Sequence, residues 1–512
     1  MLVKTYSSTV FGIEATTITI EVNLGIGINF YLVGLPDSAV KESHQRIKAA
    51  FKNNDLNFPG KEVTINMAPA DIRKEGSVFD LPIAVGILAV SDQVLPVKLS
   101  DYQMIGELSL DGALNPMKGV LPVAIQAKKE GFKGLILPLQ NAAEAAVVEG
   151  LDVIGVSDLR EVVDFLNNDK DIQPFKVDIL EQFGRMTDAF DVDFRDVKGQ
   201  MNIKRAFEIA AAGGHNVILI GPPGAGKSML AKRLPTILPP MTLEEALETT
   251  KIHSVAGRIK GDAGLITQRP FRKPHHTISH VALVGGGGFP QPGEISLAHN
   301  GVLFLDELPE YQRPVLEVMR QPLEDRTVSI SRARFSVEYP AGFMLVAAMN
   351  PCPCGYYNHP DKECVCGPGV VQRYLNKISG PLLDRIDLHV EVTPVSFNEL
   401  QKDVPSEGSL EIRKRVQTTR VMQKNRYKER SGIHCNAQMS RQEMEEYCRL
   451  DEGGISILKN AMDRLGLSAR AYDRILKVAR TIADLDGDQS ISAAHLAEAI
   501  QFRSLDKASW AG

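Results

Sequence analysis

A glycine-rich loop near the middle of the chain has the residue types and the spacing that bind phosphate. A short apolar run, Val217–Ile220, is typical of a buried strand, and it leads into the pattern G-x-x-x-x-G-K-S. Glycines let successive backbone N–H groups curl around a phosphate, and the following helix points its positive N-terminus at the same group. The lysine of this pattern reaches the β- and γ-oxygens, and the serine hydroxyl ligates Mg²⁺. The residues predicted to contact ATP are Gly221, Pro222, Pro223, Gly224, Ala225, Gly226, Lys227, Ser228 and Met229.

A second apolar run, Val302–Leu305, ends in the two carboxylates Asp306 and Glu307. A short apolar strand delivers both carboxylates to the C-terminal edge of a parallel sheet, beside the phosphate loop. We expect Asp306 to hold Mg²⁺ together with Ser228, and Glu307 to orient and deprotonate the water that attacks the γ-phosphate. An ordinary strand that runs into a polar turn gives the same pattern, but the upstream loop favours the catalytic interpretation.

A third strand, predicted over residues 343–349, ends in Asn350. A neutral amide hydrogen bonds to the attacking water or to the γ-phosphate without adding negative charge. Asn350 is therefore the predicted sensor of the nucleotide state.

Arg385 follows a short predicted helix and is a candidate arginine finger. A finger reaches the γ-phosphate held by a neighbouring subunit and neutralises charge in the transition state, so the active site would be a property of a ring. The alternative is a surface arginine that pairs with Asp384 or Asp387. The sequence leaves both interpretations open.

Beyond a strand predicted over residues 388–392, the chain reads as helical. Residues 467–476 offer a cap followed by an amphipathic helix, and residues 495–502 offer another helix. Arg470, near the start of the first of these helices, is placed to fold onto the nucleotide from a lid. Arg474 lies one turn later and is the competing candidate, because spacing does not separate the two.

Length and charge restrict the class of protein. A chain of 512 residues is too long for one hydrophobic core, so we expect about three folding units. The formal net charge of −5 excludes a globally basic nucleic-acid binder, so any contact with nucleic acid must be local. The N-terminus lacks a basic segment followed by an apolar one, and no apolar run approaches the roughly 18 residues of a membrane span. We therefore expect a cytoplasmic protein with no membrane segment.

The chain is predicted to divide into an α/β front domain, an ATP-binding α/β domain with a parallel sheet, and a helical lid. In the front domain, alternation over residues 18–24 is typical of a half-buried strand, and a second strand is expected over residues 30–33. Asp37 or Ser38 can cap the helix that follows. The predicted limits are 1–166 for the front domain, 167–195 for a polar linker, 196–395 for the ATP-binding domain and 396–512 for the lid.

The front domain resembles the proteolytic domain of the Lon family. The resemblance is carried by the residues KEGSVF at positions 74–79 and by the run GELSLDGALNPMKGVLPVAIQAKKEGFKGLILP. The Lon domain uses a serine nucleophile and a lysine base, and those positions fall here at Val78 and Leu121, which can do neither kind of chemistry. Ser77 and Lys118 lie nearby but off the matching positions. We therefore expect a Lon-like scaffold or binding domain without protease activity.

Four of the six cysteines lie close together in the sequence, in the pattern C-x-C…C-x-C. Four thiols offer a zinc ion its preferred soft ligands, although the usual spacing in zinc sites is C-x₂-C. The sequence leaves two interpretations open, a structural Zn²⁺ site or reduced thiols in a turn-rich insertion. The cluster comprises Cys352, Cys354, Cys364 and Cys366.

Residues 327–337 alternate on both sides of a basic turn and predict a β-hairpin with Arg332 and Arg334 near its tip. Arginines at such a tip grip DNA phosphates without base preference, as a translocating motor needs. A solvated hairpin without a ligand is the alternative.

Two further basic segments are candidates for nucleic-acid contact. Residues 269–276 join three cations to an aromatic residue, which suggests a DNA-contacting loop. His275 and His276, with His280, suggest a metal site, but hydrogen-bonded structural histidines are the preferred interpretation because adjacent histidines do not easily share one ion. The basic helix over residues 413–430 suits either DNA or a solvated lid face.

The order of these motifs is that of AAA+ ATPases, and the whole chain resembles the ComM/YifB family of magnesium-chelatase-like proteins. The resemblance is carried by PGEISLAHNGVLFLDELPE, SGPLLDRIDLHVEV, RPFRKPHHTISHVALVGGG and NPCPCG, together with the Lon-like front domain. It implies a homo-hexameric, ATP-driven motor on branched or single-stranded DNA, of branch-migration or helicase type, linked to recombination and natural transformation. The alternative is a protein-remodelling ATPase, like the magnesium-chelatase motor subunit, that binds no DNA.

Overall fold

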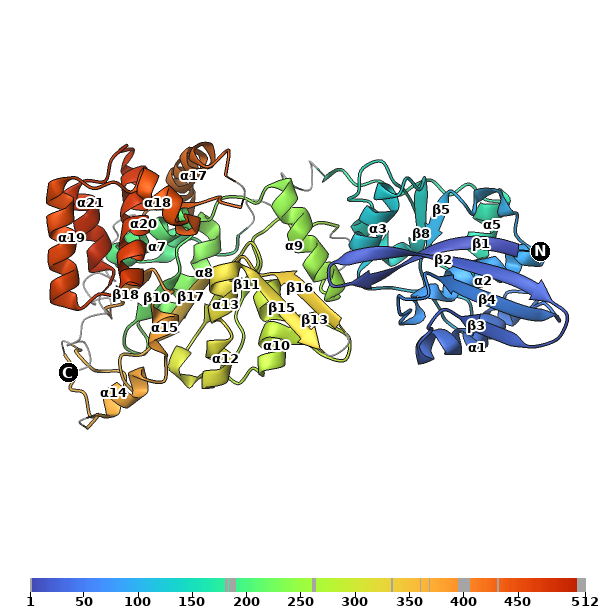
Figure 1. Ribbon diagram of the computed structural model, residues 1–512, viewed down its shortest axis with the longest axis horizontal. Helices are drawn as coiled ribbons and strands as arrows, with labels where there is room; N and C mark the ends of the chain where they lie inside the picture. The colour runs from blue at the N-terminus through green and yellow to red at the C-terminus, as the bar shows by residue number, and fades with distance from the viewer. Residues whose placement is uncertain are drawn as a thin grey trace.

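The structure is a computed structural model, and it shows an elongated molecule with the front domain at one end and the helical lid at the other (Figure 1). It describes residues 2–179, 183, 190–259, 264–332, 335–359, 361–367, 369–394, 406–430 and 432–503. A phosphate-loop α/β body lies between the two ends, so the fold class expected from the sequence is confirmed.

The front domain is a seven-stranded mixed sheet with the strand order β3-β4-β2-β1-β5-β8-β9. Its long β1–β2 ribbon was not predicted over its full length, because the first strand carries the polar residues Thr5, Ser7 and Ser8 at buried positions. The N-cap of α1 is Asp37, whose carboxylate accepts a hydrogen bond from the backbone N–H of Val40 at 2.8 Å. The strands are β1 (Leu2–Phe11), β2 (Glu14–Gly25), β3 (Phe30–Val33), β4 (Glu62–Ala68), β5 (Tyr102–Met104), β8 (Gly134–Pro138) and β9 (Asp152–Val156), and the helices are α1 (Ser38–Asn53), α2 (Asp80–Val90), α3 (Val120–Lys129), α4 (Ala142–Ala145) and α5 (Leu159–Asn167).

The central body is built on a five-stranded sheet in which every pair of neighbouring strands is parallel. Its inner strands are continuous apolar runs because both faces are covered: Val217 and Leu219 enter one core, and Ile218 enters the other. The strand order is β11 (Phe271–Arg272), β14 (Val302–Leu305), β17 (Met344–Met349), β10 (Val217–Ile220) and β18 (Leu388–Glu391).

Helices and one hairpin surround this sheet. The larger helices are α7 (Met201–Gly213), α8 (Lys227–Ile237) and α9 (Leu243–Val255), with the shorter α10 (His280–Val284), α11 (Glu294–Leu297), α12 (Arg313–Glu317), α13 (Arg320–Asp325), α14 (Val370–Leu375) and α15 (Gly380–Leu383). The hairpin consists of β15 (Thr327–Arg332) and β16 (Phe335–Pro340), as the alternation of residue types predicted.

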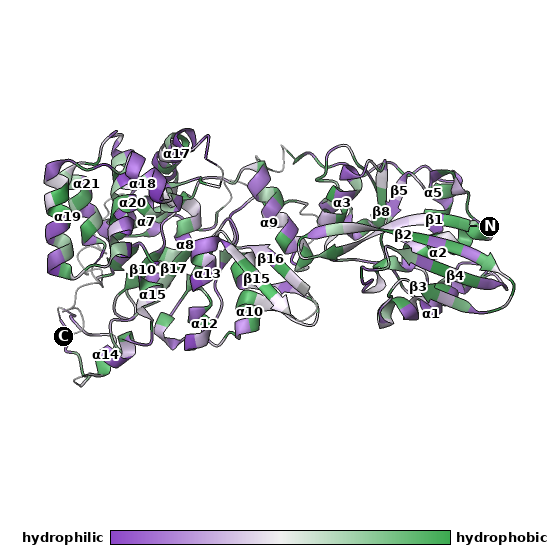
Figure 2. Cartoon of the chain, in the orientation of Figure 1, coloured by the Kyte–Doolittle hydropathy of each residue, from purple (hydrophilic) through white to green (hydrophobic). Residues whose placement is uncertain are grey.

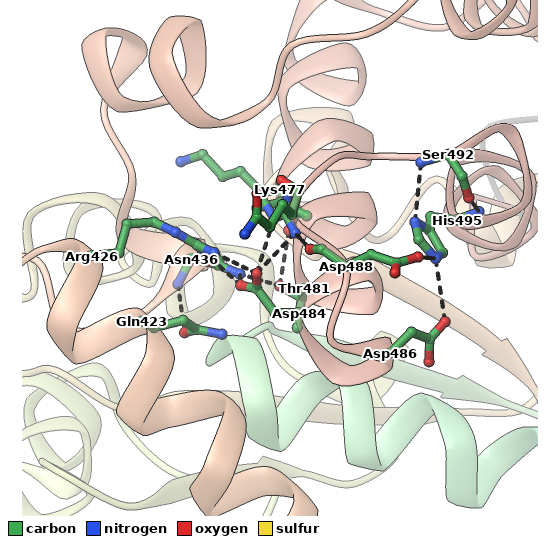
Figure 3. A network of polar contacts seen from close by, with 12 residues as sticks. Gln423, Arg426, Asn436, Lys477, Thr481, Asp484, Asp486, Asp488, Ser492 and His495 are labelled. Atoms are coloured by element: carbon green, nitrogen blue, oxygen red, sulfur yellow. Dashed lines mark hydrogen bonds and ion pairs between the residues drawn. The ribbon is translucent and has the colours of Figure 1, made fainter.

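The lid comprises α17 (Ser409–Arg426), α18 (Arg441–Tyr447), α19 (Glu452–Leu465), α20 (Ala469–Asp486) and α21 (Ala493–Gln501). Along α19 and α21, green and purple residues alternate in Figure 2, as expected for helices with one apolar face. A buried polar network ties these helices together (Figure 3): Arg426 donates two hydrogen bonds to Asp484, which also accepts one from Asn436 at 2.8 Å. Because Arg426 is on α17 and Asp484 is on α20, the network cross-links the lid.

The front domain packs against α9 of the central body. The backbone N–H of Gly119 donates to the carbonyl of Ser254 at 3.0 Å, and the Ser254 hydroxyl donates to the buried carboxylate of Glu144. An apolar cluster closes the same joint, and it includes Leu121 from α3, Val147, Ile179, Met241, Ala246 and Leu265.

A second contact joins the front domain to the hairpin. Gly12 forms part of the turn between β1 and β2, and a Cβ atom built there would lie 2.8 Å from Cγ1 of Val337. Ile13 packs against the same core as the hairpin strands. The turn of the front domain therefore lies directly on β16.

Candidate functional site

Three neighbouring strands bring the predicted catalytic residues to one edge of the central sheet. Strand β17 lies between β10 and β14, and all three run parallel, with Val217 opposite Val346 and Val302 opposite Met344. Since parallel strands end at the same edge, the phosphate loop after β10, the carboxylates after β14 and Asn350 after β17 lie together.

The phosphate loop is held close to the end of β18. A Cβ atom at Gly221 would lie 2.3 Å from the carbonyl oxygen of Val392, so only glycine allows this approach. Gln200, just before α7, donates from Nε2 to the carbonyl of Ala225 at 3.2 Å and to that of Thr393 at 3.3 Å. The loop is thus fixed from two sides before α8 begins at Lys227.

The ammonium of Lys227 is folded back onto its own loop and onto Asn350. Nζ donates to the carbonyls of Gly221 at 2.6 Å and Pro222 at 2.9 Å, and to Oδ1 of Asn350 at 3.1 Å. Burial lowers the pKa of Lys227, while the carboxylates of Asp306 and Glu307 act in the opposite direction. The lysine and the predicted sensor therefore converge on the point where the loop is shaped to hold phosphate.

Asp306 and Ser228, the two predicted Mg²⁺ ligands, are in direct contact. The Ser228 hydroxyl donates to Oδ2 of Asp306 at 2.6 Å, and Nζ of Lys273 donates to the same oxygen at 2.8 Å. Burial raises the pKa of Asp306, but the hydrogen bonds from Lys273 and Ser228 outweigh it, so the net pKa lies below the usual value. A hydroxyl beside an ionised carboxylate is the oxygen donor set that Mg²⁺ prefers, so these residues fit the ion.

Glu307 stands free enough to act on water. Its backbone is left-handed, with φ of 54°, and its side chain is 59 % exposed. Nδ1 of His276 lies 3.3 Å from its carboxylate.

Two residues at this edge of the sheet, Lys273 and His276, were not predicted from the sequence to lie there. They follow β11, a two-residue edge strand parallel to β14 that is too short to be recognised from periodicity.

All three cations of residues 269–276 bind carboxylates of the chain, and contact of this segment with DNA stays a prediction. Arg269 is held by Glu245, Arg272 donates two hydrogen bonds to Glu294 at 2.6 and 2.7 Å, and Lys273 pairs with Asp306. Within the described ranges, the cysteine cluster is the only set of three or more histidine, cysteine or acidic side chains close enough to share an ion, so the histidine metal site is not supported.

The basic helix α17 is likewise engaged inside the chain. Arg415 pairs with Glu208 and Glu407, Arg420 donates to the carbonyl of Ala211 at 3.0 Å, and Arg426 pairs with Asp484. These arginines fix the lid to the central body and to itself.

Arg385 is buried, with 4 % of its surface exposed. The surface interpretation expected a pair with Asp384 or Asp387, but Arg385 pairs with neither. Its guanidinium lies 2.5 Å from the carboxylate of Glu324 in α13. The finger role stays a prediction, and it requires the guanidinium to leave Glu324.

The two lid arginines lie in different surroundings. Arg474 donates to Oδ1 of the buried Asp387 at 3.1 Å. Asp387 precedes β18, so this pair lies at the edge of the sheet opposite the phosphate loop. Arg470 is exposed to solvent at the start of α20, and its role as the lid arginine stays a prediction.

Of the two predicted DNA-contacting arginines, the structure describes the backbone of Arg332 alone. Arg332 is the last residue of β15, where its backbone pairs with Phe335, whereas Arg334 lies outside the described residues. The strands behind them are anchored, since Ile330 and Tyr339 are buried in the core. Contact with DNA stays a prediction.

The Lon-like catalytic positions carry no nucleophile or base. Leu121 is fully buried in the joint with α9. The nearby Ser77 donates its hydroxyl to Glu107, and Lys118 is exposed beside Gly257.

A phosphate loop, an acidic strand end and a polar sensor on adjacent parallel strands, followed by a helical lid, define an AAA+ protein. Comparison with known families agrees. Residues 193–400 match the family described as magnesium chelatase, subunit ChlI, residues 20–141 match subunit ChlI of Mg-chelatase, and residues 406–503 match the ChlI C-terminal region.

Relatives that match nearly the whole chain identify the family within the AAA+ class. The chain is 45 % identical over 505 residues to the competence protein ComM of Haemophilus influenzae, covering 98 % of this chain and 97 % of the relative. It is 43 % identical over 499 residues to the YifB protein of Escherichia coli, covering 97 % and 96 %. The chain belongs to the ComM/YifB family of magnesium-chelatase-like AAA+ proteins.

A shorter match accounts for the front domain. Lon protease 2 of Bacillus subtilis is 30 % identical over 189 residues, which cover 31 % of this chain and 33 % of the relative. Among the described residues, no helix is long and apolar enough to cross a membrane.

Proposed function

We propose that this protein is an ATP-hydrolysing ring motor that moves DNA in the cytoplasm. The observation that supports hydrolysis best is the convergence of four side chains at one sheet edge, where Lys227 meets Asn350 and Ser228 meets Asp306. Two of these residues belong to the phosphate loop and two follow other strands, which supports a shared catalytic role for the loop and these strand ends.

Each side chain has a distinct task in the proposed reaction. Lys227 turns from its own loop carbonyls to the β- and γ-phosphates, and Asn350 stays beside it as the sensor. Ser228 and Asp306 hold Mg²⁺, which neutralises charge on the phosphates when bound. Glu307 orients the attacking water and takes its proton, and its exposed carboxylate is free to do so.

The proposed ring is a homo-hexamer in which a neighbour completes each site. Arg385 would supply the finger once it leaves Glu324, and Arg470 would approach from the lid. In the proposed motor, the front domain ends at residue 166, the linker at residue 195 and the ATP-binding domain at residue 395, as expected from the sequence.

DNA is the proposed substrate because two arginines, Arg332 and Arg334, belong to the short basic turn of the hairpin. The cations of residues 269–273 and the arginines of α17 named above are bound inside the chain, whereas the basic turn of the hairpin lies at the end of two anchored strands. A relative that covers nearly the whole chain is named a competence protein. This name supports the proposal that the present protein acts on single-stranded or branched DNA in recombination and natural transformation.

The ATPase rate with and without DNA tests this proposal. We expect forked or single-stranded DNA to raise the rate several-fold, and we expect an Arg332→Ala/Arg334→Ala variant to keep the DNA-free rate and lose the stimulation. The matched control is Arg441→Ala, which removes an 89 % exposed arginine of the lid. Raising the salt concentration should weaken the stimulation, because phosphate contacts release counterions.

Two outcomes would contradict the proposal. If DNA stimulates neither the wild type nor the control, the protein is better described as a remodelling ATPase like the magnesium-chelatase motor subunit. If the wild type hydrolyses no ATP under any condition, the proposed catalytic site is itself wrong.

A further inference from the structure

Four thiols that the catalytic site does not use lie together in the loop after Asn350. Sγ of Cys352 is 3.3 Å from that of Cys354 and 3.7 Å from that of Cys364, and the last two are 3.5 Å apart. Cys366 completes the group, in which all four sulfur atoms lie within 4.8 Å of one another. None of these cysteines forms a disulfide.

These distances fit one tetrahedral metal ion. With metal–sulfur bonds of about 2.3 Å, the four ligands of a tetrahedron lie roughly 3.8 Å apart, close to the spacing found here. In an iron–sulfur cluster the four thiolates are distributed over two or four iron atoms, which would hold thiolates on different irons further apart. The ligand set, four soft thiolates around a single point, is the set that structural zinc sites use.

The backbone of the loop also suits bound thiolates. The backbone N–H groups of Tyr356 and Val365 act on the sulfur of Cys354 and favour its negatively charged form. Such donors stabilise negative charge on sulfur and orient the ligand. Two further contacts stiffen the loop, since the Lys362 ammonium lies 4.8 Å from the centre of the Tyr356 ring and His359 packs edge-on against that ring.

The cysteine loop is seated directly on the phosphate loop. Cys352 is fully buried and lies two residues after Asn350. Gly355 has φ of +85°, and a Cβ atom there would lie 2.4 Å from Cδ of Pro223. Beyond this contact, Tyr357 and His359 line a hollow together with Gly221 and Pro222. Whatever fixes the cysteine loop therefore also fixes one wall of the phosphate loop.

We propose that Cys352, Cys354, Cys364 and Cys366 bind one Zn²⁺ ion, and that this ion holds the cysteine loop as a brace against the phosphate loop. The zinc site stands on the geometry of the four sulfur atoms. The brace rests on the proposed function, because its effect is measured on nucleotide binding.

Metal analysis of the full-length protein tests the zinc site. Elemental analysis of protein purified without added metal should find about one zinc per chain, and a Cys364→Ser/Cys366→Ser variant should find almost none. Cys448→Ala is the matched control, because it removes a buried cysteine outside the cluster and should leave the zinc in place. Iron in place of zinc, or no metal in the wild type, would overturn the zinc assignment.

A Co²⁺ titration tests the site on the wild-type chain, so the result does not depend on whether a cysteine variant folds. The wild-type chain is stripped of metal with a chelator under reducing conditions and titrated with Co²⁺. One equivalent should give the intense visible bands of tetrahedral cobalt thiolate, and added Zn²⁺ should remove them. The weak spectrum of octahedral cobalt would contradict a site of four thiolates.

Two glycines of the same loop test the brace. Gly355→Ala should push the loop off Pro223 and weaken the binding of a fluorescent ATP analogue about tenfold while one zinc per chain is kept. Gly367→Ala, where a Cβ would meet no atom within 4 Å, should change neither zinc content nor affinity.

The outcomes separate the two proposals. Unchanged affinity in Gly355→Ala with zinc retained would overturn the brace and leave the zinc site standing. A wild type that binds zinc but no nucleotide would overturn the proposed function instead.

Discussion

Arg385 and Glu324 form an ion pair, 2.5 Å between the charged atoms, that joins the end of α15 to the helix leading into the hairpin. Arg385 is nearly inaccessible, whereas Glu324 is 46 % exposed on its side chain. The pair therefore links the proposed finger to the proposed DNA-contacting element within one chain. Release of the finger and movement of the hairpin would then be coupled steps.

Mixing two inactive variants tests whether the site is shared between subunits. Lys227→Ala removes the phosphate-binding lysine and Arg385→Ala removes the finger, so each alone should lose about 10³-fold or more of the ATPase rate. In a one-to-one mixture, about one seam in four would combine an intact lysine with an intact finger, so activity should return to that fraction. Normal turnover by Arg385→Ala alone would rule the finger out.

Weakening the ion pair should make the finger easier to release. We expect Glu324→Gln to lower the protein concentration that gives half-maximal ATPase activity several-fold, since assembly would no longer have to break the pair. Because Arg385 is buried and would keep only a neutral partner, the variant should also lose about 1–3 kcal/mol of unfolding free energy. Glu317→Gln, which affects a neighbouring partly exposed pair with Arg320, is the control and should leave the concentration dependence unchanged.

Lys273 donates a hydrogen bond to Oδ2 of Asp306, the proposed Mg²⁺ ligand. Removing this competing cation with Lys273→Met should lower the Mg²⁺ concentration for half-maximal hydrolysis by up to about fivefold, which corresponds to ~1 kcal/mol for a partly exposed pair. A Mg²⁺ titration of the ATPase rate at fixed ATP measures the effect. An unchanged midpoint with a reduced maximal rate would instead indicate that Lys273 acts on the phosphates.

The pair between Asp387 and Arg474 should make stability depend on pH. Burial raises the pKa of Asp387, but Arg474 and hydrogen bonds outweigh it, so the folded-state pKa lies far below the usual value. A carboxyl whose pKa is lowered by folding stabilises the protein above its unfolded pKa of about 4 and loses this contribution as the pH falls.

Asp387→Asn should therefore cost about 3 kcal/mol of unfolding free energy at pH 7. The difference from wild type should stay constant between about pH 5 and 8 and shrink below about pH 4. Urea unfolding at several pH values measures this, with the exposed Asp463 changed to Asn as the control. A difference that does not change at low pH would show that the loss is one of packing and not of charge.

Restoring a lysine at the Lon position should not restore a protease. Leu121→Lys would bury an unpaired ammonium in the apolar joint with α9, at a cost of about 3 kcal/mol or more. We expect the joint to open, which limited proteolysis would detect, and we expect no peptide hydrolysis. Leu121→Met keeps the apolar contact and should behave as wild type. Peptidase activity in the lysine variant would contradict this view of the front domain.

The sequence predicted those parts of the site that are local in the chain. The phosphate loop, Asp306 after its apolar strand and the hairpin each carry a pattern within a dozen residues, so their types and order were readable. The contact of Lys273 with Asp306 was missed because the partner is 33 residues away and the strand before Lys273 has only two residues. The partner of Arg385 was missed for the same reason, since 61 residues of chain separate it from Glu324 and only the folded core brings them together.

The contact between Gly12 and Val337 has a consequence for how such a motor would work. The turn of the front domain rests on a hairpin strand with no free space between them, so the hairpin cannot shift without disturbing its neighbour. A movement of the hairpin during the proposed ATPase cycle would then displace the Lon-like domain as well. The front domain, which lacks the Lon nucleophile and base, would thereby either transmit the movement of the hairpin or resist it.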